Sequence, residues 1–164
     1  MTLQTIDSFM TRARSALQMP TLYWLGHGGW QGPEGPQATP GRPIDIHTAL
    51  AQLQATRKAV YDQYMQGLAQ NGLQLDDLPK LACDCSGFLC WALGVARTPA
   101  PIAGHWIYTP AIHADALGSH ALFVKIDQPS VGSLLVYPGV DDPDLARRQV
   151  GHVAIVSQVQ DGHA

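Results

Sequence analysis

The hydrophobic period of the chain changes well past its middle, and this change limits the possible folds more than any other feature. In the first part apolar residues repeat every three or four positions, as at Leu3, Ile6, Phe9, Ala13 and Leu17. This spacing predicts an amphipathic helix, which Pro20 ends. In the last part, residues 121–126, 133–137 and 152–159 form short β-branched stretches separated by Pro, Gly and Asp, which is typical of strands. Helices followed by strands predict an α+β fold.

Between these parts we expect a loop and a further helix. Residues 31–43 contain four prolines and three glycines, which predicts an irregular surface loop. Asp45 can then cap a helix whose apolar stripe, Ile46, Leu50, Leu53, Val60, Tyr64 and Leu68, is closed by Asn71-Gly72. We therefore expect one long helix over 45–71. It would be an insertion outside the core that covers another part of the molecule.

Composition and charge favour one globular domain over residues 1–164. The chain is 46% hydrophobic and 14% charged, enough to bury a sizeable core. The formal net charge of −3, without a run of Lys or Arg, argues against nucleic acid as a partner. No stretch reaches the roughly 20 apolar residues of a membrane span, and no signal-peptide pattern opens the chain. We expect a cytoplasmic protein as made, so that action at the cell wall or in the periplasm would need another export route.

Three cysteines, Cys83, Cys85 and Cys90, lie close together in the chain. Their odd number leaves at least one thiol outside any disulfide within the chain, and a ring closed between Cys83 and Cys85 would be strained. A metal site is disfavoured too, because no pair of cysteines or histidines has zinc-helix or zinc-knuckle spacing. We expect neither a disulfide framework nor a metal.

Cys85 opens a segment with a polar start and an apolar body that ends at Gly94. This pattern predicts a buried helix with Cys85 in its first turn, where unpaired N–H groups and the helix dipole favour thiolate over thiol. The same N–H groups can donate to the oxyanion of a tetrahedral intermediate. A thiolate nucleophile also needs a general acid for the leaving amine, and His152, at the start of a predicted strand, is the best-placed histidine. The alternatives are a buried structural thiol, as expected for Cys90, and a core histidine.

The residues around Cys85 read Asp84-Cys85-Ser86-Gly87-Phe88, followed by Trp91 and Gly94. This motif resembles the nucleophile motif of the NlpC family of cell-wall cysteine peptidases. Tyr23 with Gly28-Gly29 is similar to the family's aromatic-Gly-Gly element, residues 129–137 to its Pro-x-x-Gly-Asp-Leu-Val strand, and residues 151–155 to its histidine strand. Ser133 departs from the usual aspartate, and the stretch between the Gly-Gly element and the cysteine is much longer than in compact members. Related CHAP amidases carry a near-identical histidine strand.

The resemblance implies a papain-like core, with the Cys85 helix packed on an antiparallel sheet that carries His152. It implies hydrolysis of an amide in peptidoglycan stem peptides, above all D-γ-glutamyl-diaminopimelate, through a Cys85 thioacyl intermediate and without a cofactor. The resemblance implies that Tyr23, Asp84 and Ser86 bind substrate. Without the resemblance, the alternatives are that Asp84 only caps the helix and that Tyr23 is a core side chain. We expect Trp106 in a wall of the cleft, with a surface loop as the alternative.

The family's third polar residue, which orients the histidine, lies on the strand after the histidine strand. Residues 160–164 read as a polar turn that leads into the chain end, so this strand is expected to be cut short. His163 is the candidate, but we expect no contact with His152 and therefore weak activity. The alternatives to the peptidase are a CHAP-like amidase or acyltransferase acting on another amide and a catalytically inactive binding module.

Overall fold

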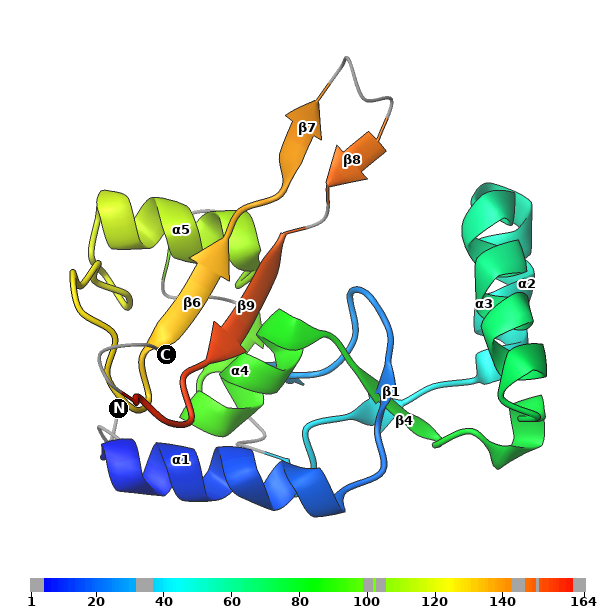
Figure 1. Cartoon of the computed structure of the whole chain (residues 1–164), viewed down its shortest axis with the longest axis horizontal. Helices are drawn as coiled ribbons and strands as arrows, with labels where there is room; N and C mark the ends of the chain where they lie inside the picture. The colour runs from blue at the N-terminus through cyan, green and yellow to red at the C-terminus, as the bar shows by residue number, and fades with distance from the viewer. Residues whose placement is uncertain are drawn as a thin grey trace.

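The computed structural model describes residues 5–31, 37–98, 102, 106–142, 147–149 and 151–160. Helices and small sheets are mixed within these residues, so the predicted α+β class is confirmed (Figure 1). None of the described helices is long and apolar enough to cross a membrane.

Helix α4 (Cys85–Leu93) forms the centre of the main core. Asp84 caps its start by accepting the N–H of Gly87, and Gly94 ends it in a left-handed conformation at φ 65°. Both features confirm the predicted helix. Helix α1 (Ile6–Ser15), extended by a short 3₁₀ turn (Ala16–Gln18), packs along α4 through Phe9 and Met10. The body of α4 is therefore buried on several sides.

A two-stranded antiparallel sheet covers α4 from another side. Strand β6 (Leu134–Tyr137) pairs with β9 (His152–Ile155), so that Tyr137 lies opposite His152. Strand β9 packs on α4, and α5 (Thr109–Leu117) packs on β6. Figure 1 shows β7 (Val140–Asp142) and β8 (Arg147–Gln149) continuing this sheet upward as a second antiparallel pair. The sheet thus brings His152 to the side of α4.

Short strands flank the start of α4 on the side away from the β6–β9 sheet. Strand β4 (Leu81–Cys83) leads directly into α4 and lies between β1 (Leu22–Tyr23), which is parallel to it, and β3 (Arg42–Pro43), which is antiparallel. Strand β2 (Trp30–Gln31) pairs in parallel with β5 (Ala96–Thr98), which follows α4. These pairings place Tyr23 next to Cys83.

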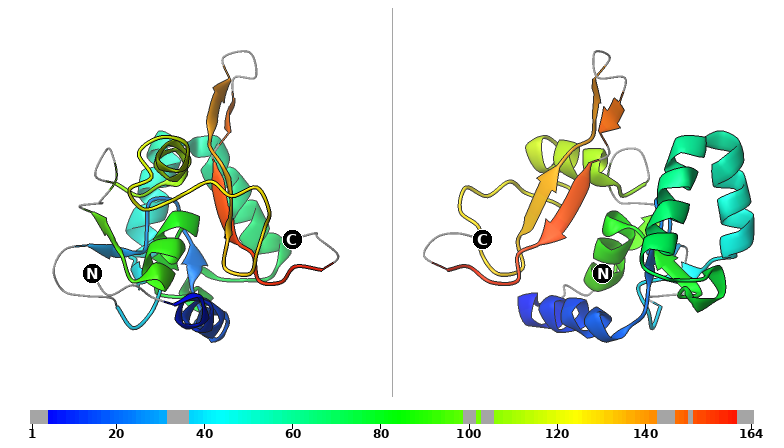
Figure 2. Two further views of the ribbon diagram at one scale, coloured as in Figure 1. Left: turned by 90° about the vertical axis from the view of Figure 1, so that its left-hand side faces the viewer. Right: turned by 45° about the vertical axis from the view of Figure 1, so that its right-hand side comes forward.

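The single long helix expected over 45–71 is wrong. The structure has two helices, α2 (Ile46–Thr56) and α3 (Lys58–Gln70), and Arg57 between them has non-helical backbone angles of φ −145° and ψ 61°. The two helices fold back on each other, so the stripe residues Leu50 and Leu68 share one small hydrophobic cluster. Each half of the stripe buries the other, which a continuous helix cannot achieve. Figure 2 shows the hairpin standing to one side of the main core.

The strand expected over 121–126 is also wrong. The N–H groups of Ala121, Leu122 and Phe123 donate to the carboxylate of Asp115 instead of to a neighbouring strand. The strand expected over 152–159 ends at Ile155, while the strand expected within 133–137 is present as β6. Helix α5 and the β7–β8 pair were not predicted. A short 3₁₀ turn (Leu75–Asp77) completes the regular elements.

Candidate active site

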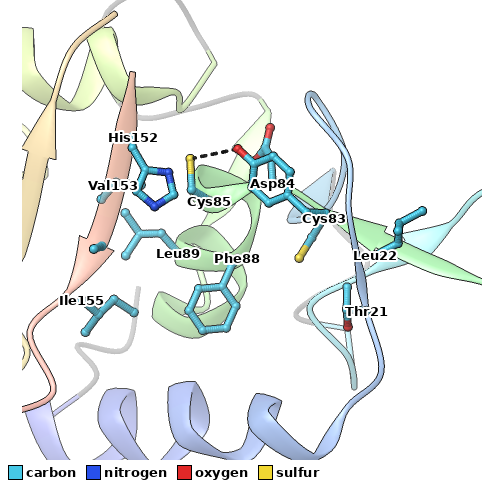
Figure 3. Close-up of a pocket in the computed structure, with 12 residues that line it drawn as sticks. Thr21, Leu22, Cys83, Asp84, Cys85, Phe88, Leu89, His152, Val153 and Ile155 are labelled. Atoms are coloured by element: carbon cyan, nitrogen blue, oxygen red, sulfur yellow. Dashed lines mark hydrogen bonds between the residues drawn. The ribbon is translucent and has the colours of Figure 1, made fainter. Parts of the chain in front are cut away.

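A cavity of about 290 Å³ opens at the start of α4 (Figure 3). One wall is β1 with Tyr23, the floor is the first two turns of α4 with Cys85 and Phe88, and the opposite wall is β9 with His152 and Ile155. Three segments that are far apart in the chain therefore meet at one thiol. No residue of α2 or α3 lines this cavity, so the hairpin does not roof it.

Cys85 is the first residue of α4 and is half-buried at the cavity. The first N–H groups of a helix have no partner inside the helix. Asp84 satisfies the N–H of Gly87 at 2.7 Å. The N–H groups of Cys85 and Ser86 are then the donors that an oxyanion beside the thiol can use.

His152 faces the thiol from the start of β9. Figure 3 shows its imidazole directed toward the Cys85 side chain. The ring of Tyr137, its partner across the sheet, lies 6.1 Å away between centroids. Among the described residues no side chain or carbonyl bonds either ring nitrogen of His152. His163, the candidate for orienting this ring, lies outside the described residues.

Tyr23 approaches the thiol from the other wall. Its hydroxyl donates to Sγ of Cys85 at 4.0 Å, and the side chain is 55% exposed. Partial burial, together with the neighbouring Cys85 and Asp84, raises the pKa of Tyr23 to about 12. The phenol therefore keeps its proton at neutral pH and remains a donor toward the sulfur or toward a nearby oxyanion.

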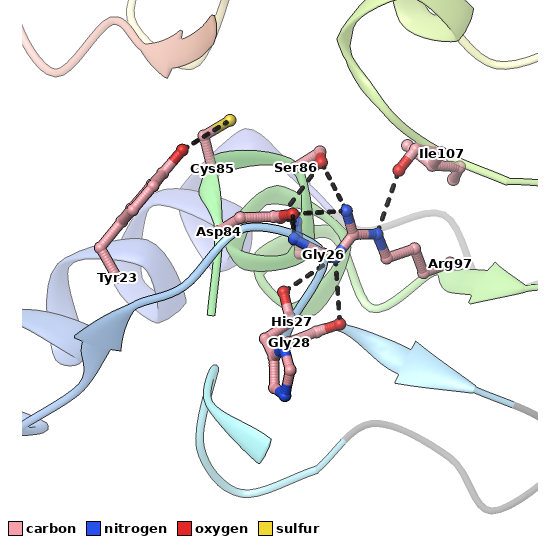
Figure 4. A network of polar contacts seen from close by, with 10 residues as sticks. Tyr23, Gly26, His27, Gly28, Asp84, Cys85, Ser86, Arg97 and Ile107 are labelled. Carbon is pink, nitrogen blue, oxygen red and sulfur yellow. Dashed lines mark hydrogen bonds and ion pairs between the residues drawn. The ribbon is translucent and has the colours of Figure 1, made fainter. Parts of the chain in front are cut away.

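Behind the thiol, a buried ion pair fixes the start of α4 (Figure 4). Arg97 on β5 donates from Nη2 to Asp84 Oδ2 and to Ser86 Oγ, at 2.8 and 2.9 Å. Asp84 is 3% exposed and Arg97 1%. Asp84 Oδ2 also accepts the N–H of Gly26, while Oδ1 accepts the N–H of Gly87 and the Ser86 hydroxyl. Asp84 and Ser86, expected to bind substrate, have their polar side-chain atoms bonded inside the protein.

The same arginine holds the loop between β1 and β2. Its remaining donors reach the carbonyl oxygens of His27, Gly28 and Ile107. Gly87 explains how the loop can lie so close, because a Cβ there would come within 2.4 Å of the His27 carbonyl oxygen. Arg97 thus ties the helix start and the loop into one rigid unit.

Trp106 does not line the Cys85 cavity. Its ring instead lies against the Arg97 guanidinium, with 4.3 Å from the guanidinium carbon to the ring centroid. Trp106 therefore stacks on the arginine of the ion pair, and the structure does not bring it to the cleft wall.

The other two thiols lie in different surroundings from Cys85. Burial, followed by the charge of Asp84, raises the pKa of Cys83 to about 11. Burial raises the pKa of Cys90, which is fully enclosed, to about 12. Both therefore stay protonated over the ordinary pH range.

Sequence reasoning missed Arg97 and Tyr137. A carboxylate that caps an apolar helix and is buried with it needs partners for its charge, and this need is the signal that could have pointed to a buried cation. Nothing in the local sequence indicates which of the ten Lys and Arg residues is the partner of Asp84. Tyr137 is found only once the register of β6 with β9 is known.

No group of three or more His, Cys, Asp or Glu side chains within the described part of the chain is arranged to hold a metal ion. Comparison of the chain with family models, with curated proteins and with solved structures finds no match.

Proposed function

We propose that this chain is a thiol-dependent peptidase or amidase with a papain-like core, in which Cys85 is the nucleophile and His152 the general acid and base. One observation carries the proposal: Cys85, the first residue of an apolar helix, shares a cavity with His152 and accepts a hydrogen bond from Tyr23. Nucleophile, base and oxyanion donors are the parts that acyl transfer through a thiol needs.

The chemistry follows from these positions. The Cys85 thiolate attacks the amide carbonyl carbon, and the oxyanion that forms accepts from the N–H of Cys85 and from the Tyr23 hydroxyl. The His152 imidazolium gives its proton to the amide nitrogen, so the C–N bond breaks and the amine leaves. Water, deprotonated by His152, then attacks the thioacyl carbon. The acid is released and Cys85 is restored.

For the substrate we propose an amide in peptidoglycan stem peptides, with D-γ-glutamyl-diaminopimelate as the first candidate. The support is the similarity of the motif from Asp84 to Phe88, and of the Tyr23 and His152 segments, to the NlpC family. The cavity is open to solvent at Tyr23, which leaves room for a branched peptide to approach.

A second candidate is acyl transfer from another, uncharged amide. No Lys or Arg in the described part of the chain lines the cavity, and the one carboxylate that these residues bring to it, that of Asp84, is bonded to Arg97. Charged groups that enter a cavity need partners, because burying an unpaired charge is costly. Leu22, Phe88 and Ile155 offer apolar contacts instead.

The two candidates are separated by incubating the full chain with purified peptidoglycan and weighing the released fragments by mass spectrometry. The peptidase predicts fragments that end at one amide of the stem peptide, and their masses identify the bond. The Cys85→Ala variant should release none. Intact peptidoglycan together with turnover of a simple neutral amide would favour the second candidate. Absence of both activities with an unreactive Cys85 would indicate a binding module.

A further inference from the structure

A second, larger cavity of about 720 Å³ lies at the opposite end of α4 from Cys85. Its walls come from α1, the end of α4, α5, residues 122–126 and β6. No residue that the structure describes lines both this cavity and the Cys85 cavity. Its volume is in the range of pockets that hold small organic molecules. The reaction proposed for Cys85 gives it no role.

The outer wall of this cavity is held in place by a buried carboxylate. Asp115 is 3% exposed and accepts hydrogen bonds from the N–H groups of Ala121, Leu122 and Phe123 at 2.8 to 3.0 Å, and from the Ser119 hydroxyl. Figure 2 shows the segment after α5 arching outward before it returns to β6.

These bonds keep the wall fixed. Burial alone would raise the pKa of Asp115, but the hydrogen bonds from Ser119 and from the three N–H groups outweigh it and lower this pKa to about 2. The carboxylate therefore stays charged and bonded at neutral pH. The Lys125 N–H adds a bond to the carbonyl oxygen of Ala116 on α5. The apolar segment is thus pinned to α5 from Asp115 to Lys125, which keeps the cavity open.

The lining is apolar with a cationic edge. Among the described residues, only Thr5, His113, Lys125 and Ser133 bring polar side chains to it, and no described Asp or Glu belongs to the lining. Ile6, Leu117, Val124 and Ile126 belong to this lining, and each is more than half exposed. Apolar side chains gathered on a surface mark binding sites. Lys125 has no carboxylate partner among the described residues. The fitting ligand has a hydrocarbon body and an anionic head.

We propose that this cavity binds the hydrocarbon chain of a fatty-acyl carboxylate, with Lys125 beside the carboxylate. The apolar walls contribute affinity through burial of methylene groups, so binding strengthens by about fourfold for each methylene until the cavity is filled. Lys125 contributes selectivity for an anion. Because Lys125 is exposed, the effect of this pair on affinity is about two- to fivefold.

The test uses the full chain and 11-(dansylamino)undecanoate, whose fluorescence rises on transfer into an apolar site. Dodecanoate, dodecanol and dodecyltrimethylammonium serve as competitors that differ only in the head group, each below its micelle concentration. We expect dodecanoate to displace the probe, dodecanol to compete about two- to fivefold more weakly, and the cation to be weaker still. Equal competition by the cation, or no fluorescence change with the wild type, overturns the proposal.

Two pairs of variants locate the binding. Lys125→Gln should weaken dodecanoate binding about two- to fivefold and leave dodecanol binding unchanged, whereas Lys80→Gln, the same charge change outside the cavity, should alter neither. Ala116→Leu fills the cavity from α5 and should weaken every competitor, whereas Ala114→Leu on the exposed side of α5 should not. Unchanged circular dichroism and Cys85 alkylation rate show that each variant is folded.

Should Ala116→Leu fail to fold, the comparison of Lys125→Gln with Lys80→Gln decides. Identical affinities of those two variants for dodecanoate overturn the proposal. So does sedimentation that shows a dimer from which the probe is excluded, because a second copy would then cover the cavity.

Discussion

The start and the body of α4 have opposite surroundings although they belong to one short helix. At the first residue, Cys85 lies at a solvent-accessible cavity between Tyr23 and His152. Five residues later, Cys90 is fully enclosed by the main core. We infer that the reactivity of each thiol on α4 depends on whether its position on the helix faces the cavity or the core. The apolar body of α4 anchors the helix, and its polar start is left for chemistry.

The polar start is itself supported from behind. The ion pair of Asp84 with Arg97 is buried, and every polar atom of both side chains has a partner. The helix start is thereby held without using the thiol or the imidazole. We therefore expect separable effects. Substitution of Cys85 should remove turnover, substitution of Arg97 should lower the stability of the fold by leaving Asp84 unpaired, and substitution of Cys90 should leave a cavity in the core.

The largest expected effect is that of Cys85→Ala, which should abolish turnover. The proposed nucleophile is lost, while the half-buried site needs no repacking, so the melting temperature should change by no more than about 2 °C. Fragment release from peptidoglycan and a thermal melt measure the two quantities. Residual turnover near the wild-type rate would remove Cys85 from the reaction.

The next effect is selectivity among the three thiols. With pKa values of about 11 for Cys83 and about 12 for Cys90, the thiolate fraction of Cys83 at pH 8 is on the order of 10⁻³, and that of Cys90 is smaller. Iodoacetamide should therefore modify the folded chain once, at Cys85, as peptide mass spectrometry can show. Because both of these pKa values are raised, modification of Cys83 should set in only as the pH approaches 11. Equal labelling of the three thiols at pH 8 would mean that the contrast along α4 is wrong.

Arg97→Met should destabilise the fold by about 3–5 kcal/mol, because it leaves the Asp84 carboxylate buried without its partner. Chemical denaturation followed by circular dichroism measures this loss. The double variant Arg97→Met with Asp84→Asn is the control. Since it removes both charges and keeps an oxygen for the Gly87 N–H, it should recover part of the stability. A single variant as stable as the wild type would show that the ion pair does not hold the helix start.

The smallest effect is expected from Cys90→Ala, which leaves a small cavity in the core. The loss should be about 1–2 kcal/mol, equivalent to a fall of roughly 2–8 °C in melting temperature. Turnover measured well below that temperature should be retained. A variant that is stable but inactive would place Cys90 in the chemistry, against its burial.

Much of the frame of the site could be predicted from local sequence. The cap, apolar body and glycine stop of α4, and the alternation of β6 and β9, are properties of neighbouring residues. That Cys85 and His152 line one cavity required the fold, although residue types indicated the pair. The break at Arg57 escaped prediction because each half of the 45–71 stripe fits a helix. Only packing of α2 on α3 decides where it bends.

The wrong strand at 121–126 and the missed Arg97 have the same physical origin. Apolar, β-branched residues favour a strand, but the Asp115 carboxylate, six to eight residues earlier on α5, takes the backbone donors that a strand would have used. Likewise, the partner of Asp84 lies beyond α4 and is brought back by β5. Polar contacts between residues that lie apart in the chain do not produce a hydrophobic period, so the periodic pattern of the sequence cannot predict them.

The most direct test of the central claim, that Cys85 and His152 act as a pair, is the rate of Cys85 carboxamidomethylation as a function of pH. It is measured for the wild type and for His152→Ala, by mass spectrometry of the Cys85 peptide. The account predicts that the wild type reacts faster near neutral pH and that its rate profile shifts when the imidazole is removed. Superimposable profiles for the two proteins would contradict it.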